Sequence, residues 1–179
     1  MSLQLQETRG LPAAPGSPWP FISVVVPVRN EATFIRATLA QLVGQNYDPD
    51  RFEVIVADGQ STDGTPGIVR RLVAGHHNLR LLANPRRWSS AGRNLGVRAA
   101  RGEIIVIVDG HCDLANPDYL RDLAEAFARS GADCVGRPQP LDVAGASTVQ
   151  RAIAAARSSW LGHHPDSFQY STRLGSHSP

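Results

Sequence analysis

The sequence predicts an α/β fold in which a doubly wound, mostly parallel sheet has helices on both faces. Strand-like and helix-like segments alternate along the chain, and parallel strands need crossover helices that cover the sheet. The run at 104–108, Ile-Ile-Val-Ile-Val, is continuously apolar and β-branched, which predicts a strand buried on both faces. Asp109 follows this run directly, at the end of a strand where open α/β sheets bind ligands.

The individual elements follow from apolar runs and from helix boundaries. Strands, each a short apolar run between turn residues, are expected at 21–28, 53–58, 80–83 and 103–109, with a fifth at 133–136. Helices, each with apolar residues three and four apart, are expected from Asn30 to Gly44, Thr65 to Gly75, Ser90 to Ala100, Asn116 to Gly131 and Ser147 to Trp160. Asn30 is expected to cap the first helix, with Phe34 on its buried face, and Thr65 is expected to cap the second helix.

Three parts of the chain differ in composition. Residues 1–20 contain four prolines and little apolar periodicity, which predicts a flexible leader without a secretory signal. Residues 21–140 are expected to form the α/β domain. Residues 141–179 are expected to form a partial segment, with one helix and a poorly defined tail.

Composition excludes several function classes. All 18 basic residues are arginine, and the net charge of +2 is too small and dispersed for a nucleic-acid partner. No apolar run is long enough for a transmembrane segment, so we expect a cytoplasmic protein, with peripheral membrane association left open. Cys112 and Cys134 are expected to be reduced thiols.

Polar side chains follow the predicted strands at the edge where ligands bind. Asp109 and His111 point the same way if the extended conformation persists, so both could bind one Mn²⁺ or Mg²⁺ ion. Alternatively, Asp109 caps the next turn and His111 is a surface residue. Arg93, near the start of a helix, would lie close to a diphosphate, and Asp58 would accept hydrogen bonds from a base or ribose.

Other polar residues have structural interpretations that compete with ligand binding. Asp63 is expected to support the entry of the second helix, and Glu31 could simply complement the dipole of the first helix. Arg86, Arg87 and Trp88 are typical of a solvated loop with an anchoring indole, although a sugar platform remains the alternative. No Gly-x-Gly-x-x-Gly follows the first strand and no Gly-Lys-Ser/Thr occurs, which argues against dinucleotide oxidoreductases and P-loop NTPases.

Three segments together resemble glycosyltransferase family 2, over roughly residues 21–136. They are Val-Val-Val-Pro-Val-Arg-Asn-Glu at 24–31, Val-Ile-Val-Ala-Asp-Gly-Gln-Ser-Thr-Asp-Gly-Thr at 54–65, and Ala-Gly-Arg-Asn-Leu-Gly at 91–96, which leads to Asp109. The resemblance implies the GT-A fold, a nucleotide-diphospho-sugar donor such as a UDP-sugar, a divalent metal, and inverting transfer to an acceptor hydroxyl. By this resemblance the donor-binding residues are Pro27, Arg29, Glu31, Asp58, Arg93 and Asp109, and the metal-binding residues are Asp109 and His111.

The sequence also departs from the family pattern. Asp58-Gly59-Gln60-Ser61 stands where Asp-Asp-Gly-Ser is usual, so one nucleoside-binding carboxylate is missing. Asp109-Gly110-His111 replaces Asp-x-Asp, and the final His is similar to the succinoglycan-type exopolysaccharide glucosyltransferases. The family places its general base beyond the donor-binding half. Asp142 and Asp166, the carboxylates after Asp133, fit no base motif, so the base is unassigned and the fold is expected to be truncated at its C-terminus.

These features predict a metal-dependent glycosyltransferase that acts on a polysaccharide or lipid-linked glycan at the cytoplasmic membrane face. One alternative is a truncated, non-catalytic module that binds nucleotide or a partner subunit. A second is a sugar nucleotidyltransferase, which would show a Gly-rich, Arg/Lys-bearing loop after its first strand, where this chain has Pro-Val-Arg-Asn-Glu at 27–31.

Overall fold

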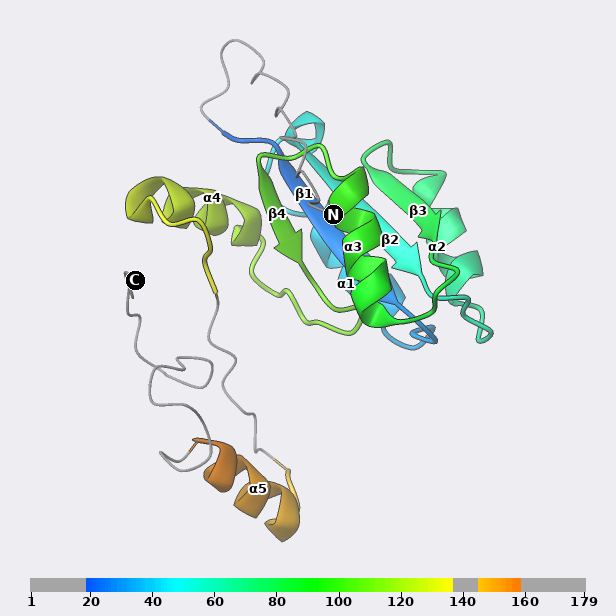
Figure 1. Ribbon diagram of the computed structural model, residues 1–179, viewed down its shortest axis with the longest axis vertical. Coiled ribbons are helices and arrows are strands. Elements are labelled where there is room, and N and C mark those ends of the chain that lie inside the picture. The colour runs from blue at the N-terminus through cyan, green and yellow to red at the C-terminus, as the bar shows by residue number, and fades with distance from the viewer. Residues whose placement is uncertain (1–18, 137–144, 159–179) are drawn as a thin grey trace, which may run out of the picture. The chain divides into compact units, whose positions relative to one another are not determined.

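The sheet has four parallel strands in the order β3-β2-β1-β4, and the computed structural model describes residues 19–136 and 145–158 (Figure 1). The strands are β1 Ile22–Val28, β2 Phe52–Asp58, β3 Leu79–Ala83 and β4 Ile104–Ile107. The chain builds β1, β2 and β3 in one direction and then places β4 on the other side of β1. This reversal creates a crevice at the carboxyl ends of β1 and β4.

Helices cover both faces of the sheet, as predicted. The described chain forms α1 Ile35–Val43, α2 Thr65–Val73, α3 Ser89–Ala99, α4 Tyr119–Ser130 and α5 Thr148–Ser158, with a short 3-10 helix at Pro49–Arg51. Figure 1 shows α3 on one face and α1 with α2 on the other. The unit that contains the sheet ends at Glu125, and α5 belongs to a second unit. The α/β class with a mostly parallel sheet is therefore confirmed.

The core lies between the central strands and the helices. Every residue of β1 and β2 is buried, because these strands are paired on both edges and covered on both faces. Helix α3 packs very closely on β1, since a Cβ atom added at Gly96 would overlap the side chain of Val25. Glycine at this position therefore sets the distance between helix and sheet.

A buried ionic cluster ties the strands together at the opposite end of the sheet from the crevice. The side chain of Glu53 is fully buried. Its carboxylate accepts hydrogen bonds from the Ser23 hydroxyl at 2.8 Å, from the Arg101 amide at 2.9 Å and from Arg80 Nη2 at 2.7 Å. The cluster thus joins β1, β2, β3 and the turn before β4.

Four sequence-based expectations about the elements were wrong. Asn30 does not cap α1, which begins at Ile35, because Asn30 adopts φ +58° and its side chain accepts from the Thr62 amide. Phe34 is 53% exposed, since it precedes the helix and lies outside its buried stripe. Thr65 is the first residue of α2 and not its cap, because Gly64 takes the cap position. No strand forms at 133–136. The side chains there are largely exposed, and the backbone pairs with no described strand.

The prediction that β4 is buried on both faces was also wrong. Its residues alternate between buried and exposed, and Ile105 and Ile107 are 40% and 42% exposed. In the register, these two residues lie beside Ser23 and Val25, on the face that α3 covers. Because α3 packs mainly on β1 and β2, these two side chains of β4 stay partly exposed.

The boundaries of the predicted parts lie partly outside the described residues. Residues 1–18, 137–144 and 159–179 are not described, so most of the leader, Asp142, Trp160 and Asp166 fall outside the structure. Trp19 and Pro20, at the end of the predicted leader, are hydrogen-bonded to the domain. The Trp19 carbonyl accepts from Arg51 Nη2 at 2.6 Å and the Pro20 carbonyl accepts from the Tyr47 hydroxyl at 2.6 Å.

Candidate functional site

A cavity of about 330 Å³ opens at the carboxyl edge of the sheet. It is lined by residues from the ends of all four strands and from the start of α3, namely Pro27, Val28, Arg29, Glu31, Ala57, Asn84, Arg87, Trp88, Ser89, Arg93, Asp109, Gly110 and His111. The parallel topology explains this convergence, because every strand ends at the same edge. Most of the predicted donor-binding residues thus share one cavity.

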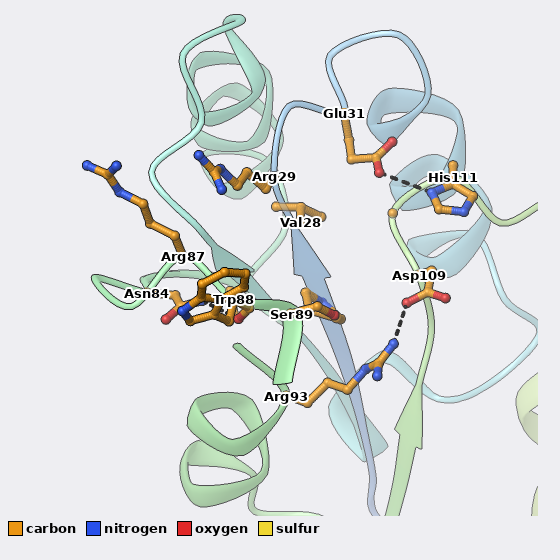
Figure 2. A pocket seen from close by; sticks show the side chains of 13 residues that line it. Val28, Arg29, Glu31, Asn84, Arg87, Trp88, Ser89, Arg93, Asp109 and His111 are labelled. Carbon is orange, nitrogen blue, oxygen red and sulfur yellow. Dashed lines mark hydrogen bonds and ion pairs between the residues drawn. The ribbon is translucent and has the colours of Figure 1, made fainter. Parts of the chain in front are cut away.

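Two ion pairs organise the side of the cavity next to β4. Arg93 Nη2 lies 3.1 Å from Asp109 Oδ1, and His111 Nδ1 lies 3.1 Å from Glu31 Oε1 (Figure 2). The two pairs join α3 to the end of β4 and the loop after β1 to the turn after β4. About half of the Arg93 and Asp109 side chains is exposed, so both groups are accessible to a ligand. This side of the cavity therefore offers the guanidinium of Arg93, the carboxylates of Asp109 and Glu31 and the imidazole of His111.

Asp58 lies near the cavity without lining it. It is the last residue of β2, beside Val28 in the register, and it is 8% exposed. One carboxylate oxygen, Oδ2, accepts from the Ser61 amide at 3.2 Å, while the buried Oδ1 has no hydrogen-bond partner among the described residues. A buried acceptor without a partner carries a desolvation cost that a ligand donor would remove.

His111 and Asp109 do not continue the strand as the sequence suggested. A turn forms at Gly110–His111, in which the Cys112 amide donates to the Asp109 carbonyl at 3.1 Å, so the extended conformation ends at Asp109. Both side chains nevertheless line the cavity. Asp113 lies outside it and accepts a hydrogen bond from Gln41 Nε2 at 2.8 Å, which accounts for this carboxylate structurally.

Helix α1 holds the turn after β4 in place, a role that sequence reasoning missed. The hydroxyl of buried Thr38 lies 3.1 Å from the Gly110 carbonyl and 3.0 Å from the Cys112 carbonyl, and can donate to either. Gln41 adds a second contact by accepting from the Leu114 amide at 2.7 Å. Burial raises the pKa of the Cys112 thiol, which therefore stays protonated near neutral pH. Both described cysteines are free.

The loops after β1 and β2 brace each other. The Ala32 amide donates to Asp63 Oδ2 at 2.9 Å, and the Glu31 amide donates to the Thr65 hydroxyl at 2.9 Å. Asp63 also accepts from the Thr65 amide and hydroxyl, so it supports the start of α2 as expected. Hydrogen bonds lower the pKa of Asp63, the largest effect coming from the Thr65 hydroxyl and the next from the Ala32 amide. These side chains position the loop that carries Glu31.

Backbone strain is concentrated around the cavity. The described non-glycine residues with positive φ are Asn30, Gln60 and Arg87, and they lie in the loops after β1, β2 and β3 respectively. Left-handed conformations at non-glycine residues are costly, and they gather where surrounding contacts and function require them. The strain therefore marks the carboxyl edge of the sheet as the specialised region of the domain.

A divalent cation fits the chemistry of the site. Asp109 and His111 supply an oxygen and a nitrogen ligand atom, and Nε2 of His111 is available to a metal when Nδ1 donates its hydrogen bond to Glu31 Oε1. The described residues contain no cluster of three or more His, Cys, Asp or Glu that could hold a metal alone. Mg²⁺-type sites commonly combine one or two protein ligands with waters and substrate phosphates, so two protein ligands are compatible with such an ion.

Comparison with known proteins decides the family. A family model for glycosyl transferase family 2 matches residues 23–164. The chain belongs to glycosyltransferase family 2. Succinoglycan biosynthesis protein ExoA of Rhizobium meliloti is 36% identical over 142 residues, which cover 78% of this family 2 chain and 42% of ExoA. The resemblance to succinoglycan-type enzymes, drawn from the histidine after Asp109, is thereby confirmed.

Two solved structures share the fold of this family 2 chain. Mannosyltransferase PcManGT from Pyrobaculum calidifontis, in complex with GDP-Man and Mn²⁺, is 35% identical with a TM-score of 0.60 and covers 69% of this chain and 40% of that chain. Residues 1–349 of TarS from S. aureus, in complex with UDP, are 28% identical with a TM-score of 0.57. This match covers 66% of this chain and 38% of that chain. The expected GT-A fold is confirmed.

This family 2 chain spans about two fifths of the length of the curated relatives it matches, 38% for a glycosyltransferase of Haloferax volcanii and 42% for ExoA. In the part of the chain that the structure describes, no helix has the length and apolar character needed to cross a bilayer.

Proposed function

We propose that this chain is the donor-binding part of a metal-dependent, inverting glycosyltransferase. It would bind a nucleotide-diphospho-sugar, and we expect a UDP-sugar. The sugar would be transferred to a hydroxyl of a polysaccharide or lipid-linked glycan at the cytoplasmic membrane face. The observation that carries the proposal is the single cavity that brings together Glu31, Arg93, Asp109 and His111 at the carboxyl edge of the sheet. The arginine side chain suits phosphate, and the carboxylate side chains suit a divalent cation.

The diphosphate would lie beside β4. Arg93 presents a planar guanidinium there, which suits phosphate oxygens. Asp109 and His111 would hold Mn²⁺ or Mg²⁺. When bound, this ion would neutralise the charge that develops on the leaving diphosphate. Arg93 would exchange its ion pair with Asp109 for the phosphate oxygens.

The nucleoside would lie toward β2 and β3. Pro27 and Arg29 line this part of the cavity, and Arg29 makes no hydrogen bond or ion pair with any described residue. The unsatisfied Oδ1 of Asp58 suits an N–H or O–H donor of the base or ribose.

A binding screen tests the proposal directly. Calorimetry of the full chain with UDP-, GDP- and dTDP-sugars, each with and without Mn²⁺, should find at least one donor that binds more tightly with the metal. Binding of no donor under either condition would contradict the proposal.

A second candidate function is a donor-binding module without turnover of its own. The observation that favours it is that the described residues after Asp133 contain no carboxylate that could act as a general base. A hydrolysis assay with the donor found in the screen separates the two, because release of free sugar shows catalytic competence and its absence favours the binding module.

A further inference from the structure

The loop after β3 places a large aromatic side chain at the cavity without burying it. Trp88 lines the cavity and is 73% exposed, the highest exposure among the large apolar residues of the sheet-containing unit. An anchoring indole would be buried, so the expectation that Trp88 anchors a solvated loop was wrong. Exposing an indole forgoes the favourable burial of a large apolar surface, which calls for a role other than packing.

The loop that presents Trp88 is tightly held by its backbone. Buried Asn84 donates through its amide to the Asp58 carbonyl at 2.8 Å and through Nδ2 to the Trp88 carbonyl at 3.0 Å. The Gly92 amide also donates to the Trp88 carbonyl at 3.0 Å, and the Arg87 amide donates to the Asn84 carbonyl. The indole is thus exposed on a backbone that is fixed to both β2 and α3.

Gly59 and Gln60 make room for this loop and fasten it. A Cβ atom at position 59 would lie 2.8 Å from the Arg87 carbonyl oxygen, so only glycine accommodates the loop at this distance. Gln60 Oε1 accepts a hydrogen bond from Arg87 Nε, and both residues adopt positive φ, at 58° and 65°. The departure from the usual Asp-Asp-Gly-Ser pattern therefore has a structural counterpart, because the loop after β3 occupies the space beside residue 59.

The position of Trp88 indicates which part of a ligand it would meet. The charged groups that suit a diphosphate, Arg93, Asp109 and His111, lie at the end of β4. Trp88 follows β3, at the opposite edge of the sheet, and Figure 2 shows it across the cavity from Asp109 and His111. A nucleotide with its phosphates beside β4 would extend its base toward Trp88.

We infer that Trp88 forms a stacking platform for the nucleobase of the donor, held in place by Gly59 and Gln60. Flat heterocycles stack on exposed aromatic side chains, and the neighbouring Asp58 Oδ1 would accept from the edge of the same base. This inference rests on the proposed function. It adds a binding surface on the loop after β3 to the residues that the sequence patterns indicate.

The test compares a probe that has a base with one that lacks it. Calorimetry of the full chain with UDP and with inorganic pyrophosphate, both with Mn²⁺, is carried out on the wild type and on Trp88→Ala. Loss of one stacked base is expected to weaken UDP binding about tenfold or more, while pyrophosphate binding stays unchanged. Trp88→Phe should retain most of the UDP affinity, because it keeps an aromatic face.

Matched variants separate stacking from other roles. Phe34→Ala removes another exposed aromatic residue, outside the cavity, and should leave UDP binding unchanged. Gln60→Ala, which releases the Arg87 side chain, should weaken UDP binding without affecting pyrophosphate. Thermal unfolding of each variant confirms that it is folded.

Several outcomes would overturn the inference. Equal UDP affinity in wild type and Trp88→Ala would show that the indole does not contact the base. An equal loss of UDP and pyrophosphate affinity would show that Trp88 acts on the phosphate region. Unchanged UDP binding with reduced binding to anionic phospholipid vesicles would assign the indole to a membrane surface. If the wild type binds neither UDP nor pyrophosphate, the proposed function and the inference fail together, whereas binding of pyrophosphate without binding of UDP overturns the inference alone.

Discussion

At the scale of single residues, the described part of the chain contains two buried carboxylates with opposite environments. Glu53 is surrounded by donors, whereas Asp58 has one buried oxygen without a partner. Burial by itself would raise the pKa of Glu53, but hydrogen bonds from Arg101 and Ser23 and the charge of Arg80 outweigh it and lower the pKa. Glu53 therefore serves stability, whereas Asp58 keeps one buried acceptor without a hydrogen-bond partner among the described residues.

The buried carboxylate of Glu53 makes stability depend on pH. Because its pKa is lower in the folded state than in the unfolded chain, its stabilisation is present above the unfolded pKa and is lost as the pH falls through the folded pKa. Glu53→Gln leaves Arg80 and Arg101 without their charged partner and should lower the free energy of unfolding near neutral pH by about 3 kcal/mol.

Urea unfolding between pH 3 and pH 7 measures this effect. The wild type should lose stability toward low pH, and Glu53→Gln should show a shallower dependence. Asp50→Asn is the control, because Asp50 is highly exposed and pairs with an exposed histidine. Equal stability of Glu53→Gln and wild type at pH 7 would show that the cluster adds no net stability.

At the scale of elements, helices α1 and α3 position the site from opposite faces of the sheet. Helix α1 holds the turn after β4 through Thr38, and α3 carries Arg93 on a backbone that lies close to β1 because of Gly96. The cavity therefore depends on helix placement as well as on the residues that line it.

Replacing Thr38 by valine removes the hydroxyl and keeps the shape of the side chain. The Gly110 and Cys112 carbonyls would lose a shared donor, so we expect a loss of about 1 kcal/mol in stability and weaker Mn²⁺-dependent UDP binding. Chemical unfolding and calorimetry measure the two effects. Thr33→Val, at an exposed position just before α1, is the control and should change neither. Unaltered UDP affinity in Thr38→Val would show that α1 does not position the metal-binding turn.

The close contact between α3 and β1 predicts an unusually costly alanine substitution. A methyl group at Gly96 would overlap Val25, so Gly96→Ala should destabilise the domain by about 1–3 kcal/mol despite the better helix propensity of alanine. Gly67→Ala in α2 is the control, because a Cβ atom there would meet only Arg71 Nη1 at 3.8 Å. A destabilisation of Gly96→Ala no larger than that of Gly67→Ala in thermal unfolding would contradict the packing described for α3.

At the scale of the whole molecule, the sequence was sufficient to locate the four strands and most of the cavity. Apolar runs located β1 to β4, and the carboxyl ends of those strands carry Arg29, Glu31 and Asp109. These predictions depend on local pattern and on topology, which parallel strands restrict strongly. The family resemblance adds the chemical roles.

The features that could not be predicted depend on contacts between segments distant in sequence. Asparagine is a residue type that commonly caps helices, but the side chain of Asn30 accepts a hydrogen bond from the Thr62 amide in the loop after β2. Exposure of Ile105 and Ile107 follows from which strands α3 covers, and no single segment encodes that. The exposure of Trp88 depends on space at Gly59, 29 residues earlier in the chain.

We propose that Asp109 and its neighbours form a metal-dependent site for a nucleotide diphosphate. Titration of UDP into the wild-type chain and into Asp109→Asn, each with and without Mn²⁺, tests it most directly. We expect Mn²⁺ to increase the affinity of the wild type for UDP by at least tenfold and to have no effect on Asp109→Asn. Equal UDP affinity with and without Mn²⁺ in the wild type, or an undiminished metal effect in Asp109→Asn, would contradict the claim.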